Sequence, residues 1–302
     1  MRAAAILGLG SNEKDLKPFQ KNSDATWLIG LPTTADDADV ILIFGGDGTV
    51  HRHLSQLVKL QRPVLVVPCG SGNDFARALS LRGIRDSLTA WQQFASGAKN
   101  VRTIDLGLII PLEPAARGVP APQLNYFCCV AGVGLDGEVA RRANRLPRWL
   151  RGHGGYVLSL APALLRFNSV RTRIDVPKDS QHAEFMTRID TPAILAAFAN
   201  APSYGGGMKI APHAQLDDGQ LDVCLISDIN KLRLLGVLPS VYFGRHLNMS
   251  EVEYFQAQRL RVTTEQPLDV YADGEYVCST PVEVSVVPAA FQVVVRKPKT
   301  ES

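Results

Sequence analysis

The feature that most constrains this chain is a glycine-rich loop that directly follows the apolar residues 40–44. A short apolar run rich in β-branched residues predicts a buried parallel strand. The loop's glycines let the backbone turn sharply and approach a ligand closely. An ordinary strand-to-helix turn with an aspartate cap is the alternative interpretation. The loop consists of Gly45, Gly46, Asp47, Gly48 and Thr49.

A second glycine loop strengthens the ligand-binding interpretation. Residues 63–67 are another apolar run, and residues 50–60 between the two runs have helical spacing. Strand, turn, helix and strand within about 30 residues predict a βαβ unit with parallel strands. Both glycine loops then lie at the same edge of one sheet, where open α/β sheets bind ligands. The second loop contains Gly70, Ser71, Gly72, Asn73 and Asp74.

Composition indicates a globular protein large enough for two domains. The chain has 302 residues and a net charge of +3, which is too small to argue for nucleic acid binding. Its five cysteines form no CxxC pair, and its six histidines form no metal-spaced cluster. No stretch approaches the roughly 20 apolar residues that span a bilayer, and residues 3–9 are too short for a secretory signal. We therefore expect a cytoplasmic protein.

The pattern changes near Asp105. Residues 1–105 alternate strands and helices and predict an α/β domain, which residues 288–302 could complete. Residues 106–287 predict a mostly antiparallel β domain. We expect helices there only at 138–167 and 232–243. The expected strands after Asp105 are 106–110, 126–130, 170–176, 193–199, 221–226, 260–264, 268–271, 276–277 and 282–287, with a last strand at 291–295 that could join either domain.

Five motifs in order resemble the bacterial diacylglycerol kinase-type lipid kinase family. The two glycine loops are followed by NAPSYGGGMKIAP at 200–212, DGQLDV at 218–223 and DGE at 273–275. The first loop alone is shared with NAD kinases and sphingosine kinases, so the later motifs carry the specificity. The resemblance covers nearly the whole chain. It implies a Rossmann-like nucleotide domain, a β-sandwich-like substrate domain and an active site in the cleft between them.

The resemblance implies that both glycine loops hold the phosphates of ATP. Free backbone N–H groups and the dipole of a helix over 74–80 would suit an anion there. Ser71 stands where the family usually has threonine, and it keeps the hydroxyl group. Capping of that helix by Asn73 or Asp74 is the structural alternative.

The family resemblance also implies two magnesium sites. Asp47 would hold the catalytic Mg²⁺ through water, with Asp74 and Asp105 in the same network. A strand-end turn is an equal alternative for Asp105. A structural Mg²⁺ site would use the Asp218 side chain and backbone carbonyls near Gln215 and Gln220, where a plain acidic turn is the alternative.

Asp273 is the candidate general base, with Glu275 in support. A carboxylate within hydrogen-bond reach can take the proton of an attacking hydroxyl group, and the family assigns this role to the aspartate of Asp-Gly-Glu. Asp273-Gly274 is also a strong hairpin-turn signal between two expected strands.

A membrane lipid is the expected substrate, and peripheral contact with the inner face of the membrane follows from it. Arginines beside tryptophan and tyrosine suit anionic headgroups, although basic runs are usually solvated faces. The family has dimeric members, so a homodimer is one expected form. The residues of this basic stretch are Arg141, Arg142, Arg145, Leu146, Arg148, Trp149, Leu150, Arg151 and Tyr156.

The chain departs from the family pattern at two places. Val50-His51-Arg52 follows the first loop where the family has x-Asn-Glu, and Gly8-Leu9-Gly10-Ser11-Asn12 stands where the family has Asn-Pro-x-x-Gly. The leading hypothesis is an ATP- and Mg²⁺-dependent kinase of a lipid hydroxyl, with diacylglycerol as the default substrate. The alternatives are a related kinase of a soluble hydroxyl, such as NAD, and a non-catalytic nucleotide- or lipid-binding regulator.

Overall fold

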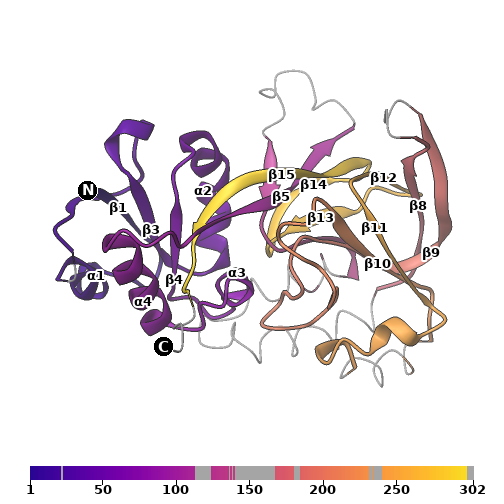
Figure 1. Ribbon diagram of the computed structural model, residues 1–302. Coiled ribbons are helices and arrows are strands. Elements are labelled where there is room, and N and C mark those ends of the chain that lie inside the picture. Colours follow the sequence, from indigo (N-terminus) through magenta and orange to yellow (C-terminus); the bar gives the residue numbers. More distant parts are fainter. Residues whose placement is uncertain are drawn as a thin grey trace. The chain divides into compact units, whose positions relative to one another are not determined.

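The computed structural model describes residues 1–21, 23–112, 124–135, 137, 139, 167–179, 184–230, 233 and 240–297. The chain divides into two compact units (Figure 1). The first contains Met1–Ile104 and Ala289–Ser302, and the second contains Asp105–Pro288. The predicted order, an α/β region followed by a β-rich region, is confirmed. None of the helices in the described ranges is long and apolar enough to cross a membrane.

The first unit is built on a parallel sheet whose strand order is β2-β1-β3-β4-β15. Strand β3 is buried along its whole length, as its continuous apolar sequence predicts. Residues Ile41 to Gly45 pair in parallel with Val64 to Pro68, so the predicted βαβ unit is confirmed. The strands are β1 (Arg2–Leu7), β2 (Thr26–Ile29), β3 (Val40–Gly45), β4 (Val64–Pro68) and β15 (Val282–Val294).

Helices cover both faces of this sheet (Figure 1). Helix α1 contacts α4, whereas α2 contacts β3 and α3. Their apolar residues face the strands, as in α2, where Val50, Leu54 and Leu57 are buried. The helices are α1 (Glu13–Gln20), α2 (Asp47–Leu60), α3 (Asp74–Ala78) and α4 (Ile84–Ala95), with a 3₁₀ turn η1 (Ala35–Asp37).

The last strand differs from the prediction. The sequence predicted separate strands at 282–287 and 291–295, but β15 runs without a break from Val282 to Val294. Its first part pairs with β12 in the second unit, and Val293 pairs with Val64 of β4 in the first. Ala289 takes a positive φ of 51° within this strand. The residues after Pro288 thus return to the α/β unit.

The second unit is antiparallel, as predicted. Its strands follow the order β14-β13-β7-β9-β8-β12-β15, and β10 joins β9 to β11. Buried side chains from these strands, including Phe127, Phe198 and Leu260, form one core. The strands are β5 (Val101–Pro111), β6 (Asn125–Phe127), β7 (Val130–Gly134), β8 (Val170–Pro177), β9 (Phe185–Ala199), β10 (Leu221–Ser227), β11 (Val252–Ala257), β12 (Arg259–Thr264), β13 (Asp269–Ala272) and β14 (Glu275–Ser279), with a 3₁₀ turn η3 (His246–Asn248).

Two strand predictions in this unit are wrong. The expected strand 126–130 is divided into β6 and β7, with Cys128 and Cys129 between them. Strand β11 was not predicted, because it pairs only with β10 and has no fully buried face to produce a clear pattern. Most residues of the helices predicted at 138–167 and 232–243, and the whole basic stretch 141–156, lie outside the described residues.

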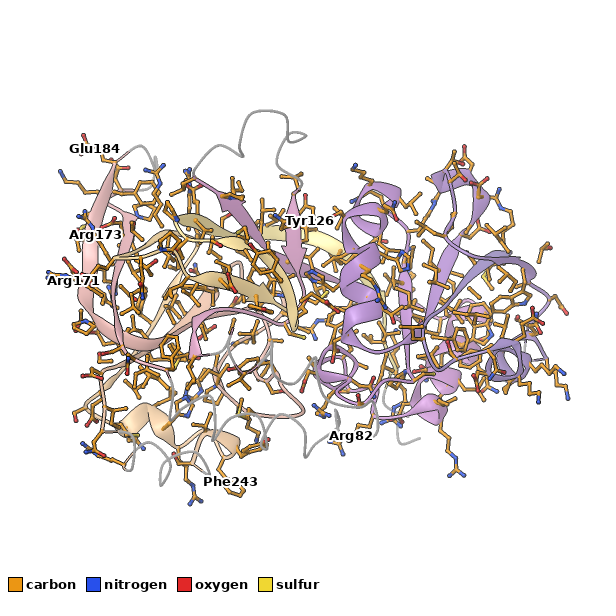
Figure 2. All side chains as sticks on the ribbon, turned by 180° about the vertical axis from the view of Figure 1, so that it is seen from behind. Arg82, Tyr126, Arg171, Arg173, Glu184 and Phe243 are labelled. Carbon is orange, nitrogen blue, oxygen red and sulfur yellow. The ribbon has the colours of Figure 1, made fainter. Side chains whose placement is uncertain are left out.

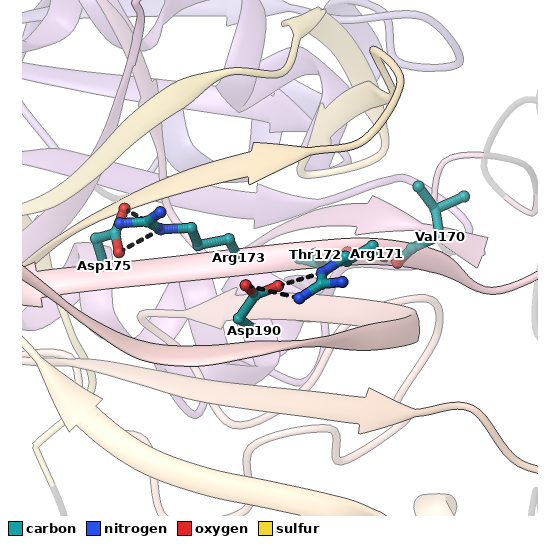
Figure 3. A network of polar contacts seen from close by, with 6 residues as sticks. All are labelled: Val170, Arg171, Thr172, Arg173, Asp175 and Asp190. Carbon is teal, nitrogen blue, oxygen red and sulfur yellow. Dashed lines mark hydrogen bonds and ion pairs between the residues drawn. The ribbon is translucent and has the colours of Figure 1, made fainter.

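The outer face of β8 and β9 carries paired charges. Arg171 contacts Asp190 at 2.7 Å, and Arg173 contacts Asp175 at 2.8 Å (Figure 3). Figure 2 shows both arginines on the outer surface of β8. Because exposed ion pairs typically contribute about 1 kcal/mol or less, these pairs add little to stability.

Candidate active site

Three loops of the first unit meet at the carboxyl edge of its parallel sheet. Strands β1 and β3 are neighbours, and their following strands, β2 and β4, lie on opposite sides. Such a switch point is where open α/β sheets bind ligands. The Gly8 N–H donates to the Phe44 carbonyl at 2.8 Å, and the Cys69 N–H donates to the Gly45 carbonyl at 3.0 Å. The loops after β1, β3 and β4 are therefore hydrogen-bonded to one another.

The two glycine motifs touch backbone to backbone. A Cβ atom on Gly70 would lie 2.5 Å from the Cα of Gly46, so only glycine fits at this contact. Asn73 has a φ of 55°, and its side-chain oxygen accepts from the Gly70 N–H at 3.0 Å. Its side-chain nitrogen donates to the Gly70 carbonyl at 2.6 Å. Asn73 thus holds the turn that brings the second loop against the first.

Thr49 lies beneath these loops. A Cβ atom on Gly45 or on Gly8 would lie 2.6 Å from the Thr49 Oγ1 atom. Thr49 is buried, whereas Ser71 is exposed at the tip of the second loop. Gly8 was not predicted to belong to the site, although its position directly after the first strand was a usable signal.

Asp47 has a structural role that the sequence did not reveal. Helix α2 begins at Asp47 and not at residue 50, so the predicted loop residues Gly48 and Thr49 form its first turn. The Asp47 carboxylate accepts hydrogen bonds from the Asp74 and Phe75 N–H groups, each at 3.0 Å. It therefore caps α3 across 27 residues of sequence.

This cap changes which N–H groups of the second loop can meet an anion, while the phosphate site itself stays a prediction. The helix spans Asp74–Ala78, not 74–80, and its first two N–H groups bind Asp47. They cannot also serve a phosphate in this arrangement. Helix α2 starts after Gly46, which supplies no side-chain cap. Its amino terminus is the helix end at this edge that suits an anion.

A second carboxylate lies beside Asp47. Asp74 pairs with Arg77, whose other nitrogen donates to the Gly72 carbonyl at 2.8 Å. A Cβ atom on Gly72 would lie 3.0 Å from Asp47 Oδ2 and 3.6 Å from Asp74 Oδ2. Two carboxylates therefore converge on the second loop. Arg77 was not predicted, and its spacing of three residues from Asp74 was the available signal.

Asp105 lies within β5 and is held by hydrogen bonds to another segment of the chain. It lies in the second unit, where its Oδ2 atom accepts from the Gly219 N–H at 2.7 Å and its N–H donates to the Leu216 carbonyl at 2.6 Å. The residues that the structure describes contain no group of three or more histidine, cysteine, aspartate or glutamate side chains that could hold a metal ion. Asp47 and Asp74 belong to the first unit and Asp105 to the second, so the expected network of these three residues stays a prediction.

The residues of the expected structural magnesium site lie in one short loop before β10. Asp218 Oδ1 accepts from the Gln220 N–H at 3.0 Å, and Oδ2 accepts from Gln256 at 3.2 Å. Gln215 lies in the same loop and is exposed. Burial raises the pKa of the neighbouring Asp222, while hydrogen bonds from Tyr254 and Gln256 act in the opposite direction. No described contact tests metal binding, so this site stays a prediction.

Asp273 lies in a tight turn, and its side chain contacts a segment that is distant in the sequence. Asp273 and Gly274 have φ values of 51° and 86° and form the two-residue turn between β13 and β14. The Asp273 carboxylate accepts from the N–H groups of Cys128 and Cys129, each at 2.8 Å, and of Val130 at 3.3 Å. The side chain is thereby held in one orientation. Glu275 is half-buried at the start of β14.

Two protein-family models match successive parts of the chain. The diacylglycerol kinase catalytic domain matches residues 10–109, and the YegS C-terminal NAD kinase beta sandwich-like domain matches residues 129–295. A diacylglycerol kinase of Mycobacterium tuberculosis is 33% identical over 89% of this chain and 81% of its own length. The chain belongs to the diacylglycerol kinase family of lipid kinases. It is therefore a kinase.

Solved structures share the fold of this lipid kinase. A diacylglycerol kinase from Bacillus anthracis matches with a TM-score of 0.65 and 18% identity over 97% of this chain and 96% of its own. An NAD kinase from Archaeoglobus fulgidus in complex with ATP matches with a TM-score of 0.54 and 14% identity over 99% and 94%. At these identities the likeness establishes the two-part fold alone. The predicted position of the active site between the two units stays a prediction.

Proposed function

We propose that this lipid kinase transfers the γ-phosphate of ATP, with Mg²⁺, to a hydroxyl group of a membrane lipid, and that diacylglycerol is the first substrate to test. The observation that carries this proposal is the backbone contact between the two glycine loops at the switch point. Phosphoryl transfer depends mainly on positioning and on neutralising charge, and this edge offers means for both.

The glycine loops would hold the phosphates. Gly46 and Gly70 leave the backbone accessible because neither carries a Cβ atom. The amino terminus of α2 adds the favourable end of a helix dipole. Ser71 is exposed and can donate its hydroxyl group to a phosphate oxygen. Gly45 ends β3, Gly48 and Thr49 lie in the first turn of α2, and Gly72 and Asn73 shape the second loop.

Asp47 and Asp74 are the residues that fit a catalytic Mg²⁺. Both are hard oxygen donors, and both face Gly72. Mg²⁺ is usually bound through one or two carboxylates, several waters and the substrate phosphates, so two carboxylates suffice. The bound ion would neutralise charge on the phosphate oxygens. Arg77 would keep Asp74 and Gly72 in place.

Asp273 is the proposed general base, and Glu275 is the proposed supporting residue. A base must present a carboxylate in a fixed position to the hydroxyl group that attacks phosphorus. Three backbone N–H groups fix the orientation of the Asp273 carboxylate. The base would take the proton from the lipid hydroxyl as the bond to phosphorus forms.

The lipid substrate requires contact with a membrane, which we propose is peripheral and on the cytoplasmic side. Phe243 supports this proposal, because its side chain is 70% exposed (Figure 2) and lies 5.9 Å from the Arg245 guanidinium group. An exposed aromatic ring beside a cation suits the headgroup region. In flotation with vesicles containing anionic lipid, Phe243→Ser should recover less protein than the wild type. The exposed Met186 on β9 provides the control Met186→Ser, and equal flotation of all three proteins would contradict this contact.

The direct test of function uses γ-labelled ATP, Mg²⁺ and the full chain. The acceptors are vesicles that contain diacylglycerol, other hydroxyl-bearing lipids or neither, together with NAD in solution. We expect label in a lipid, and loss of the transfer when EDTA removes Mg²⁺. Label in NAD would identify a kinase of a soluble acceptor. ATP binding without transfer to any acceptor would favour the regulator alternative.

A further inference from the structure

Asn200 is a buried polar residue of the second unit. It follows β9, and its side chain is fully buried. Its side-chain nitrogen donates to the Asp105 carbonyl at 2.9 Å and to the Cys128 carbonyl at 3.1 Å. Its backbone N–H donates to the Cys129 carbonyl at 2.8 Å. One residue thus joins β5 to the turn between β6 and β7.

The orientation of this amide is fixed by its neighbours. Two carbonyl oxygens face the side-chain nitrogen, so the flipped amide would place oxygen against oxygen. The side-chain oxygen is buried and has no hydrogen-bond partner among the residues that the structure describes. A buried acceptor without a partner has a free-energy cost. The two hydrogen bonds that the nitrogen donates therefore set the orientation of the amide.

The carbonyls that Asn200 holds belong to the same peptide planes that bind Asp273. In the plane between Cys128 and Cys129, the carbonyl oxygen accepts from Asn200 and the N–H donates to Asp273 at 2.8 Å. In the next plane, the Cys129 carbonyl accepts from the Asn200 N–H, and the Val130 N–H donates to Asp273 at 3.3 Å. Because a peptide unit is rigid, fixing its carbonyl end fixes the direction of its N–H end.

We propose that Asn200 is a positioning residue for phosphoryl transfer, acting through the Cys128–Cys129 peptide to orient the Asp273 carboxylate. This inference rests on the proposed function of Asp273 as the base. Asn200 does not touch the reacting atoms. It sets the position and angle at which the carboxylate meets the attacking hydroxyl group. A displacement of about 1 Å in such a group can reduce the rate strongly.

The kinetic test is a double-mutant cycle on Asn200 and Asp273. Asn200→Ala should lower kcat about 10- to 100-fold while the KM for ATP stays within about twofold. In an Asp273→Asn background the same change should lower kcat by less than about threefold, because the group it positions is gone. Equal losses in both backgrounds would overturn the proposal. Asn200→Leu, which keeps nearly the same side-chain volume and removes both donors without adding a charge, should match Asn200→Ala in its effect on kcat.

Asn100 provides a matched control. It is also buried and donates to the Ala90 and Val295 carbonyls at 2.9 Å each, and its side-chain oxygen has no partner in the described part of the chain. It lies in the first unit, in the segment between α4 and β5. Asn100→Ala should reduce thermal stability about as much as Asn200→Ala. Its effect on kcat should be small and independent of Asp273, since it contacts neither peptide plane.

A second readout does not depend on activity. Amide hydrogen exchange of the full chain, resolved at Cys129 by NMR, reports the hydrogen bond to Asp273 directly. Asn200→Ala should speed exchange at Cys129 about tenfold or more, and Asn100→Ala should leave it unchanged. If the wild type transfers no phosphate but this exchange result holds, the kinase proposal fails and the positioning contact stands. Unchanged exchange at Cys129 in Asn200→Ala would overturn the positioning contact itself.

Discussion

Replacing Gly70 by alanine tests the contact between the two glycine loops. The new Cβ atom would lie 2.5 Å from the Gly46 Cα atom, and ordinary van der Waals contact begins at 3.4 Å. The loops would have to separate by about 0.9 Å. Both neighbours on this side are backbone atoms, so no side chain can rotate away. The Asn73 oxygen, 2.9 Å from the new atom, would also be displaced.

The expected cost follows from overpacking. Inserting a methyl group into a well-packed region costs about 1–3 kcal/mol. Alanine also restricts the unfolded chain more than glycine does, which stabilises the folded state by about 0.4–1 kcal/mol. We therefore expect Gly70→Ala to lower the free energy of unfolding of the first unit by about 1–2 kcal/mol. Because the loops that separate are the proposed phosphate loops, the Kd for ATP should rise as well.

Urea unfolding followed by tryptophan fluorescence measures this change. Trp27 and Trp91 both lie in the first unit, with ring centroids 5.3 Å apart, and report its unfolding. Gly83→Ala is the matched control, since nothing lies within 4 Å of its added Cβ atom. It should cost about 0.5 kcal/mol or less. If Gly70→Ala unfolds at the same urea concentration as Gly83→Ala, the proposed loop contact is wrong.

Two further predictions address the site and the fold. Arg77→Ala should raise the Kd for ATP about tenfold in calorimetry, because Asp74 and the Gly72 carbonyl lose their shared partner. The control Arg85→Ala, at an exposed position, should leave the Kd for ATP unchanged. An unchanged Kd in Arg77→Ala would show that Arg77 does not belong to the site. His246 is buried, and burial lowers its pKa below the ordinary 6.5, with the hydrogen bond at the Ile210 carbonyl partly opposing this. The unfolded chain therefore binds the proton first, so stability should fall as pH drops below about 6.5, by at most ~1.4 kcal/mol per pH unit for this group. In thermal melts from pH 5 to 8, the melting temperature should depend less on pH in His246→Gln than in the wild type. An equal dependence on pH in both proteins would contradict this role of His246.

The sequence predicted the parts of the site that depend on strand ends. Residues 40–44 and 63–67 are continuous apolar runs, which is the pattern of parallel strands buried on both faces. Their following loops meet at one edge because parallel strands share direction. The Asp273-Gly274 turn was equally readable, because two residues with positive φ are typical of tight hairpins.

The sequence could not reveal contacts between distant peptide groups. Asp47 caps α3 because two loops touch, and no local pattern around either residue reports that approach. The same holds for Asn200, whose three acceptors come from two other segments of the chain. Strand β15 was predicted as two strands at 282–287 and 291–295, but it runs from Val282 to Val294 because its two ends pair with strands of different units.

The most direct test of the account is the rate of a single turnover with excess enzyme, γ-labelled ATP and vesicles containing the lipid acceptor. Wild type and Asp273→Asn are compared at saturating ATP, and thermal melts verify that both are folded. Loss of a general base should slow transfer about 10²- to 10⁴-fold, while the Kd for ATP should stay unchanged because the proposed phosphate loops lie in the first unit. A single-turnover rate for folded Asp273→Asn equal to that of the wild type would contradict the role of Asp273 in catalysis.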